Sequence, residues 1–352
     1  MSKTDGMAAL NLEMPDRVPR TEYSADFHWK LLAHETDIKV DSDSSDDMKL
    51  AAQRAFYKCW NYDFIWNINV AHEALGEYYT DMGHAVFQSD GSDFHGVGDS
   101  KFKDEDDVLK FDPIGQLHSG TQKELVTFFN TKYAESRKRY DDVVNMCGTY
   151  ISCMSGLIDL FGWDLLLTAA GVDPEGFGAV ANRYADWMMQ YYYALAECDS
   201  PVIMIHDDIV WTEGPFLHPD WYRKYIFPNY KRYFKPLIDA GKKIVYTSDG
   251  TYTQFVDDIA ECGVNCFVME PTTDMAYIAD KYGKTHSFIG NADTRILLLG
   301  SKEDIYNEVK RCMDIGKKCP GFFMAVGNHI PSNTPIENAL WYNECYEKLS
   351  RR

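Results

Sequence analysis

From residue 141 onward, short apolar runs of β-forming residues alternate with helical stretches, and each run stops abruptly at polar residues. The runs cover residues 143–148, 201–205, 243–246, 265–269, 287–290 and 321–326. Continuous apolar runs of this length are typical of parallel strands, because such strands are buried on both faces. The pattern therefore predicts an α/β fold with a parallel sheet.

The N-terminal part of the chain adds two predicted strands, at residues 17–23 and 64–69. The strands then start at Arg17, Phe64, Val143, Pro201, Lys242, Asn265, Ser287 and Gly321. Eight parallel strands with helices between them close into a (β/α)8 TIM barrel. An open doubly wound sheet usually carries a glycine-rich phosphate loop after its first strand, and this sequence has none there. We expect a single barrel domain spanning residues 1–352.

Helical spacing of apolar residues predicts the intervening helices. They fall at 47–60, 120–139, 156–198 with a break around Gly171–Pro174, 220–240 with interruptions at Pro228 and Pro236, 275–282 and 302–317. Residues 1–16 are polar, and we expect an N-terminal arm or short helix. Residues 71–115 show weak periodicity, so residues 71–140 are interpreted as an elaborated loop and helical insertion after the second strand.

The charge balance excludes several classes of partner. The chain has 35 Lys and Arg against 54 Asp and Glu, a net charge of -19, which repels nucleic acid and anionic membrane surfaces. No apolar stretch approaches the roughly 20 residues that cross a bilayer, and the first residues lack a secretory pattern, so we expect a cytoplasmic protein. The nine cysteines are scattered without a Cys-x-x-Cys pair, which favours neither a disulfide framework nor a zinc ribbon.

Polar residues gather where the predicted strands end. They are Thr149-Tyr150, His206-Asp207-Asp208, Ser248-Asp249, Glu270, Asn291 to Asp293 and Asn328-His329. Barrel enzymes carry their active sites at this end of the strands. We predict His206, Asp207, Asp208, Asp249 and Glu270 as catalytic groups. Structural interpretations stay open, because His206 can bond to a backbone group and these aspartates can cap or form turns.

Aromatic side chains at or just past the strand ends are candidates for a substrate slot. They are Tyr23, His28, Trp66, Tyr150, Trp211 and Tyr246, and Asn291 is a candidate polar contact. A flat apolar ring needs aromatic walls with few polar anchors. Aromatic residues make up 14% of the chain, however, so several would reach any barrel mouth.

The order of several short motifs resembles the uroporphyrinogen decarboxylase superfamily over nearly the whole chain. The motifs are Pro15-Asp16-Arg17-Val18-Pro19, Asp207-Asp208-Ile209, Gly214-Pro215-Phe216, His218-Pro219, Ser248-Asp249-Gly250, Glu270-Pro271, Gly290-Asn291-Ala292-Asp293, Gly327-Asn328-His329-Ile330-Pro331, Thr334-Pro335 and Glu337-Asn338. Each motif is weak alone, and their order and spacing carry the resemblance. It implies either porphyrinogen decarboxylation or methyl transfer to the cobalt of a corrinoid.

Two features favour the methyltransferase branch. Decarboxylases of the superfamily carry an arginine-rich motif of the type Arg-Gln-Ala-Gly-Arg on the first strand, whereas this chain reads Arg20-Thr21-Glu22-Tyr23-Ser24. The predicted mouth is also acidic, and carboxylates would destabilise a bound polyanion by several kcal/mol where the charges are partly desolvated. Decarboxylation is therefore the second interpretation, and a non-catalytic binding component of a methyl-transfer system is the third.

Within that branch, the resemblance points to the first methyltransferases of O-demethylase systems. Members that methylate coenzyme M hold zinc with His-x-Cys and a later Cys, and this chain has Thr247, Asp249 and Asn328 at those positions. The resemblance thus implies transfer of a methyl group from a small methoxylated aromatic substrate to the Co(I) of a separate corrinoid protein. The chain has no Asp-x-His-x-x-Gly stretch with which to bind a cobamide itself.

Cleaving an aryl ether requires help at the departing oxygen, since a phenol has a pKa of about 10. A general acid or a metal ion supplies that help. If zinc is bound, the expected ligands are Asp249, Glu270 and His329. An alternative set is Asp293, Glu308 and His329, which resembles an acid-x14-acid-x20-His arrangement of some O-demethylase methyltransferases. We expect Glu308 to face solvent, because barrel helices pack outside the strands.

Overall fold

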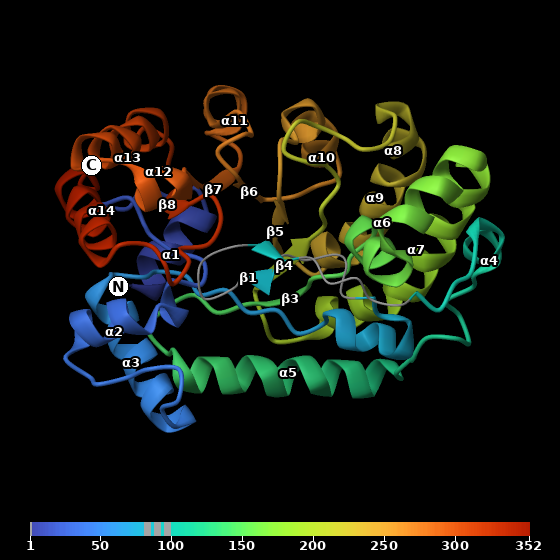
Figure 1. Ribbon diagram of the computed structural model, residues 1–352, viewed down its shortest axis with the longest axis horizontal. Coiled ribbons are helices and arrows are strands. Elements are labelled where there is room, and N and C mark those ends of the chain that lie inside the picture. Colours follow the sequence, from blue (N-terminus) through green and yellow to red (C-terminus); the bar gives the residue numbers. More distant parts are fainter. Residues whose placement is uncertain (1, 81–85, 88–92, 95–99) are drawn as a thin grey trace.

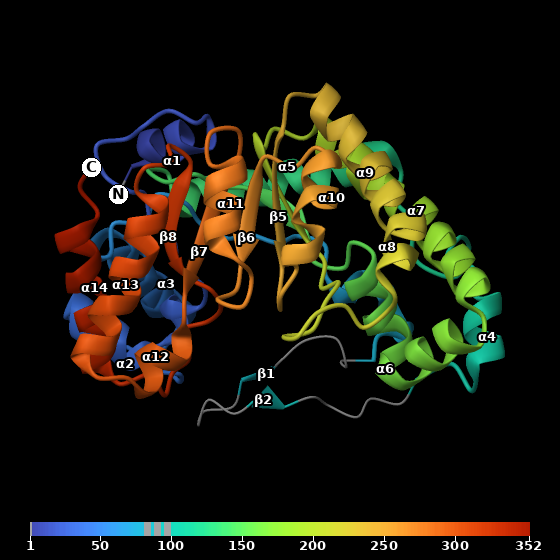
Figure 2. The same ribbon diagram turned by 90° about the horizontal axis from the view of Figure 1, so that it is seen from above.

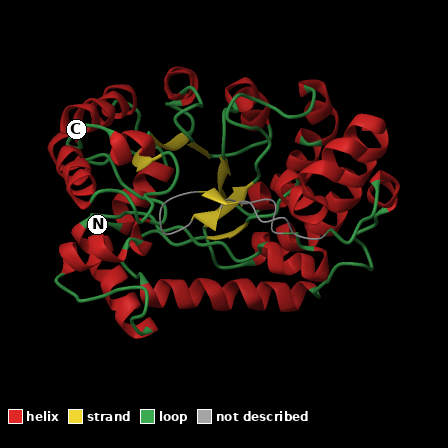
Figure 3. Ribbon diagram, viewed as in Figure 1, coloured by secondary structure: helices red, strands yellow, loops and turns green. Residues whose placement is uncertain are grey.

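The computed structural model describes residues 2–352 apart from 81–85, 88–92 and 95–99 (Figure 1). Six consecutive parallel strands form the main sheet, each hydrogen-bonded to the next in chain order. They are β3 (Cys147–Thr149), β4 (Val202–His206), β5 (Lys243–Ser248), β6 (Cys266–Met269), β7 (Ser287–Ala292) and β8 (Phe322–Val326). Helices surround these strands on the outside (Figure 3). The predicted strands from residue 143 onward are thus confirmed, with shorter bounds.

The two N-terminal strand segments close the barrel through isolated bridges and form no regular strands. Arg20 pairs in parallel with Met324 of β8, and Phe64 pairs in parallel with Val144 just before β3. The two segments meet where the Asp63 amide donates to the Arg20 carbonyl at 2.8 Å. Regular ladders are interrupted because the Arg20 amide bonds to the Asp63 side chain instead, at 2.9 Å. The expected (β/α)8 barrel is confirmed.

Fourteen α-helices occur in the described part of the chain. They are α1 (Lys3–Leu10), α2 (Trp29–Thr36), α3 (Asp46–Cys59), α4 (Glu105–Lys110), α5 (Gln122–Arg139), α6 (Met154–Val172), α7 (Pro174–Glu197), α8 (Pro219–Tyr225), α9 (Phe227–Asp239), α10 (Val256–Glu261), α11 (Met275–Tyr282), α12 (Thr294–Leu299), α13 (Lys302–Gly316) and α14 (Ile336–Leu349). Figure 2 shows many of them around the sheet from above. Two short strands, β1 (Val86–Phe87) and β2 (Asp93–Phe94), pair antiparallel.

Most predicted helices lie where the sequence placed them, and one break differs. The stretch 220–240 divides at Ile226, so that Pro228 lies in the first turn of α9, where a missing amide hydrogen costs nothing. Pro236 was expected to interrupt the helix but lies inside α9. That expectation was wrong because the apolar face of α9, with Phe234 and Leu237, is fully buried and holds the last turn in place.

The N-terminal arm is an ordered helix that seals the base of the barrel. Ala9 and Leu10 of α1 join the apolar side chains inside the barrel, among them Phe64 and Val144. Gly6 lies so close to the Asp63 carbonyl that a Cβ atom would come within 2.4 Å of that oxygen. The close approach of α1 to the barrel therefore requires glycine at this position.

Helix α6 corrects the expectation that no apolar stretch approaches membrane-spanning length. Its 19 residues have a mean hydropathy of 1.3, enough by length and composition to cross a bilayer. Most of it is buried within the protein, and Gly162 kinks it with a φ of 71°. Its apolar character is accounted for by packing in the core.

Candidate functional site

A cavity of about 700 Å³ opens at the carboxyl ends of the strands. Six of the predicted site residues line it: Tyr23, Trp66, Tyr150, His206, Asp249 and His329. The N-terminal segments and the ends of β3, β4, β5 and β8 deliver these side chains. The barrel thus assembles residues that lie more than 300 positions apart in the chain.

An acidic centre beside the cavity consists of His206, Asp208 and Asp249. One nitrogen or oxygen atom from each lies within 4.8 Å of the others. The His206 Nε2 atom is 3.3 Å from Asp208 Oδ1, which also accepts the Asp249 amide at 2.8 Å. Desolvation raises the pKa of Asp249 well above its usual value, and the charges of Asp208 and Glu270 raise it further.

Tyr150 fixes the orientation of His206. Its ring lies parallel to the imidazole with centroids 3.8 Å apart, and its carbonyl oxygen is 3.4 Å from His206 Nδ1. Nδ1 therefore faces a backbone acceptor, and Nε2 faces Asp208.

Asp207 is turned away from the cavity into the protein. It is fully buried and accepts hydrogen bonds from the amides of Cys153 at 3.1 Å and Ser155 at 2.7 Å, and from the Tyr230 hydroxyl. Burial raises the pKa of its carboxyl group. Its contacts tie the loop after β3 to the end of β4 and do not reach the space available to a ligand.

Glu270 holds two neighbouring loops together. Its Oε2 atom accepts the Gly250 amide at 2.7 Å, and its Oε1 atom accepts the Asn328 side-chain amide. These two hydrogen bonds hold the Glu270 carboxylate next to Asp249 and link the ends of β5, β6 and β8. No charged partner of Glu270 occurs among the ion pairs of the described residues.

His329 and the Tyr23–Trp66 pair form another wall of the cavity. Tyr23 and Trp66 stack with centroids 4.2 Å apart, and the His329 ring meets Tyr23 edge-on at 6.3 Å. His329 Nδ1 is 2.5 Å from the Ser24 hydroxyl, and burial lowers the pKa of the imidazole to about 4. His329 is therefore neutral at pH 7.

Two predicted aromatic contacts lie away from the cavity. His28 caps α2, with Nδ1 accepting the Leu31 amide and Nε2 2.8 Å from the Thr334 carbonyl oxygen. Trp211 is half exposed and packs on Trp163 and Phe216. Both lie just past strand ends, as expected, but their local contacts turn them elsewhere.

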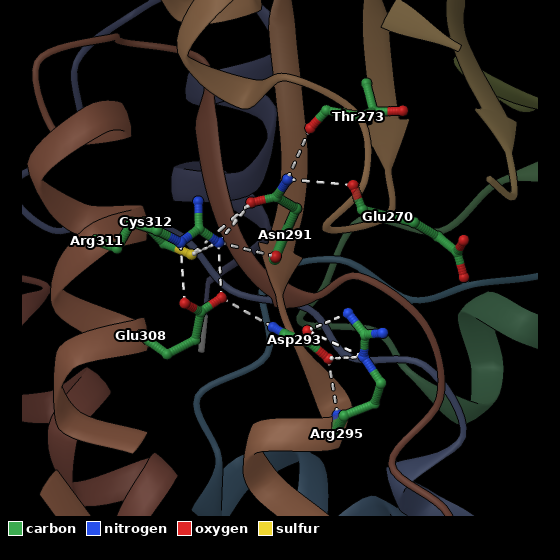
Figure 4. Close-up of polar contacts among 8 residues, drawn as sticks. All are labelled: Glu270, Thr273, Asn291, Asp293, Arg295, Glu308, Arg311 and Cys312. Carbon is green, nitrogen blue, oxygen red and sulfur yellow. Dashed lines mark hydrogen bonds and ion pairs between the residues drawn. The ribbon is translucent and has the colours of Figure 1, made fainter. Parts of the chain in front are cut away.

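The side chains of Tyr246 and Asn291 form part of the barrel wall. Tyr246 belongs to the outer, helix-facing cluster, and its hydroxyl donates to the Asp207 carbonyl at 3.2 Å. Asn291 donates to the carbonyls of Glu270 and Thr273, both at 3.2 Å (Figure 4). Strand periodicity explains Tyr246, because alternate side chains face opposite sides of the barrel.

The expectation that Glu308 faces solvent was wrong. Its side chain is buried, and its Oε1 atom accepts the Asp293 amide at 2.9 Å (Figure 4). Arg311 neutralises it at 2.6 Å and also donates to the Asn291 side chain. Asp293 pairs with Arg295 at 2.6 Å. The two carboxylates are near each other, and each already has an arginine partner.

Arg20 belongs to a buried structural network that we did not predict from the sequence. Its Nε atom donates to Glu22 at 2.8 Å, and its guanidinium group lies over the rings of Trp60, Tyr342 and Tyr346. Both side chains of the Arg20–Glu22 ion pair are fully buried. This arginine is therefore not available to an anionic ligand.

The cavity also extends to residues that the sequence did not single out. Lys132 and Arg139 of α5 line its outer part together with Gln53 and Tyr57 of α3. Neither helix carries a motif, and only the packing of α3 and α5 beside the opening brings them there.

Three comparisons agree with this architecture. The model of the uroporphyrinogen decarboxylase (URO-D) family matches residues 108–349. The uroporphyrinogen decarboxylases of Syntrophotalea carbinolica and Geobacter sulfurreducens are each 26% identical, over 178 and 179 residues. These matches cover 51% of this chain, and the chain spans about half the length of the curated relatives it matches.

The solved structure of a methyltransferase from Methanosarcina mazei has the same fold. The two structures superpose with a TM-score of 0.66 over 98% of both chains, at 16% sequence identity. This likeness shows the fold and extends over the N-terminal segments that the family model does not cover. Since the family model matches well over half of a chain folded as a barrel with its polar strand ends at one mouth, the chain belongs to the URO-D family.

Proposed function

We propose that this protein is a methyltransferase that takes a methyl group from a methoxylated aromatic compound and passes it to a corrinoid protein in the cytoplasm. The observation that carries the proposal is the charge at the strand ends: Asp249 lines the cavity with Asp208 beside it, while the nearby Arg20 is sequestered by Glu22 and three aromatic rings. A substrate with many carboxylates would meet repulsion there. A neutral ether would not.

The walls of the cavity suit a flat ring. Trp66 and Tyr23 form one aromatic surface, and Tyr150 forms another beside His206. Aromatic walls with few polar groups bind apolar rings and leave orientation to a small number of contacts. The volume of about 700 Å³ lies within the range of pockets that hold small molecules.

The residues at the acidic centre supply help for the departing oxygen. When the methyl–oxygen bond breaks, the electron pair stays on the aryl oxygen, which must be protonated or bound by a Lewis acid. Asp249 is crowded by Asp208 and Glu270, so a proton or a cation at this point relieves their repulsion. The same proton or cation would then stabilise the phenolate. A corrinoid carried by a partner protein would supply the Co(I) nucleophile that accepts the methyl group.

Zinc would act as the Lewis acid, but the two expected ligand sets offer few free ligand atoms. Both oxygens of Glu270 accept hydrogen bonds that hold loops, and Glu308 and Asp293 are paired with arginines. His329 Nδ1 is engaged by Ser24. We therefore assign no catalytic step to a zinc ion bound by those residues.

The test is incubation of the protein with a reduced corrinoid protein and a panel of methoxybenzoates and methoxyphenols. We expect the absorption of methyl-cobalt to appear and to be lost in Asp249→Asn. The matched control is Asp293→Asn, which removes a carboxylate at the mouth that is already paired with Arg295. Methyl-cobalt formation by D249N at the wild-type rate would refute the role of Asp249.

The decarboxylase alternative is supported by the names of the relatives and predicts porphyrinogen turnover without cobalt. If the protein decarboxylates porphyrinogens and no methoxylated compound yields methyl-cobalt, the proposed function is wrong. Binding of the corrinoid protein without methyl transfer across the panel, unchanged in D249N, would identify a non-catalytic binding component instead.

A further inference from the structure

We infer that His206, Asp208 and Asp249 form a divalent-cation site beside the cavity, at the carboxyl ends of β4 and β5, of a chemistry suited to zinc. Use of this ion as the Lewis acid at the ether oxygen rests on the proposed function. Binding of the ion does not, and it is measured separately.

The ligand atoms already lie close together. One atom from each residue is within 4.8 Å of the other two, and the His206 Nε2 and Asp208 Oδ1 atoms are 3.3 Å apart. Two ligands of a tetrahedral zinc ion are roughly 3.4 Å apart when each bond is about 2.1 Å long. Small movements of the Asp249 side chain, which faces the open cavity, would complete a three-ligand set.

The donor set is that of a catalytic site. Three protein ligands of imidazole and carboxylate type leave a coordination position for water or substrate. Here that position opens into the cavity, because Asp249 and His206 both line it. A site with this composition would hold an ion where an ether oxygen could reach it.

Contacts around the ligands fix their orientation as in known metal sites. A metal-binding histidine usually donates its second ring N–H to a backbone carbonyl or a carboxylate. His206 Nδ1 faces the Tyr150 carbonyl oxygen at 3.4 Å, which leaves Nε2 as the ligand atom. The Asp208 amide donates to the Ser155 hydroxyl at 2.7 Å, which anchors the second ligand.

Three other carboxylates near the mouth already have a cation beside them. Glu22, Asp293 and Glu308 each have an arginine within 3 Å (Figure 4 shows the last two). In the part of the chain that the structure describes, neither lysine nor arginine forms an ion pair with Asp249. Clustered carboxylates repel one another, and a divalent ion bound between them offsets that repulsion.

The experiment is a titration of the chelator-treated full chain with Zn²⁺ by calorimetry, and with Co²⁺ by visible absorption. We expect one site per chain. His206→Ala and Asp249→Asn should each weaken binding by at least about 100-fold, the upper end of the loss seen when residues around a metal site are changed. We expect Asp249→Asn to fold normally, because the side chain lies in the open cavity. A loss of binding in this variant therefore reports on the site and not on misfolding.

The matched controls are Glu270→Gln and His329→Gln, which change neighbouring groups of the same kinds. We expect His329→Gln to keep an affinity within threefold of the wild-type value, and Glu270→Gln to weaken binding by less than tenfold, because it removes only a neighbouring charge. Wild-type affinity in both H206A and D249N would overturn the inference, as would loss of binding confined to E270Q and H329Q. If no ion binds while methyl transfer proceeds in chelator, this inference fails and the proposed function stands on proton donation alone.

Discussion

The neighbouring residues Asp207 and Asp208 have opposite environments. Replacing them one at a time distinguishes a role in folding from a role in ligand binding. Asp207 is fully buried and accepts hydrogen bonds from two amides and from the Tyr230 hydroxyl. Asp208 contacts His206 beside the cavity. We therefore expect Asp207→Ala to destabilise the fold, and Asp208→Asn to change ligand binding and leave the fold intact.

The magnitude follows from the donors that Asp207→Ala leaves behind. Three buried donors lose their acceptor, at about 1–3 kcal/mol each. Burial raises the pKa of Asp207, so its removal returns part of the cost of burying a charge. We expect a net loss of about 3–5 kcal/mol, against a total stability of roughly 5–15 kcal/mol for a typical protein.

Asp207→Asn serves as the graded control. Its remaining oxygen can accept the amides of Cys153 and Ser155, while its new side-chain NH2 group faces the Tyr230 hydroxyl, which must then accept instead of donate. We expect a loss of about 1–2 kcal/mol for this variant, and less than about 1 kcal/mol for Asp208→Asn.

Urea unfolding at pH 7, followed by circular dichroism, measures all three variants. The midpoints should fall in the order wild type, D208N, D207N, D207A, with slopes that match the wild type. A D207A midpoint equivalent to less than about 1 kcal/mol of destabilisation would refute the structural role of Asp207. Equal losses in D207A and D208N would refute the contrast between them.

Three further predictions concern the walls of the cavity and the buried Arg20–Glu22 ion pair. Trp66→Ala should weaken binding of a methoxybenzoate by about tenfold in calorimetry, because it removes a stacking surface, whereas Trp211→Ala outside the cavity should leave the affinity unchanged. Burial lowers the pKa of His329 to about 4 from 6.5 in the unfolded chain, so its contribution to stability is complete above pH 6.5 and is lost as the pH falls towards 4. His329→Gln should therefore remove up to about 3 kcal/mol of pH dependence from urea unfolding, and an unchanged pH profile would contradict the assignment. Arg20→Met should cost about 3–5 kcal/mol in the same assay, because it leaves Glu22 buried without a partner, and the double variant with Glu22→Gln should recover part of that loss.

Local sequence patterns predicted most of the barrel, because each strand and each helix is formed by consecutive residues. The apolar runs predicted β3 to β8, and helical spacing predicted α11 at its observed bounds, 275–282. The first two predicted strands, at 17–23 and 64–69, form no regular strands and pair through isolated bridges instead. Pro236 was misread because burial of the α9 face outweighs the local preference of proline.

The candidate site was predicted in part for the same reason. Tyr23, Trp66 and Tyr150 line the cavity as expected, but the strand-end rule could not distinguish them from Tyr246, which faces the helices. The burial of Glu308 was missed because Arg311, one turn later on α13, compensates its charge, and that pairing depends on how the helix packs against β7.

The sequence by itself determined the order of strands and helices, the family, and the concentration of polar residues at one end of the sheet. These features follow from local periodicity, burial on both strand faces and the spacing of short motifs. Only the tertiary structure decided which of those polar groups meet. Each strand end can turn toward the cavity or toward the surrounding helices, and that choice depends on partners far away in the chain. The structure directs Asp208 and Asp249 towards His206, and it directs Asp207 into the protein interior.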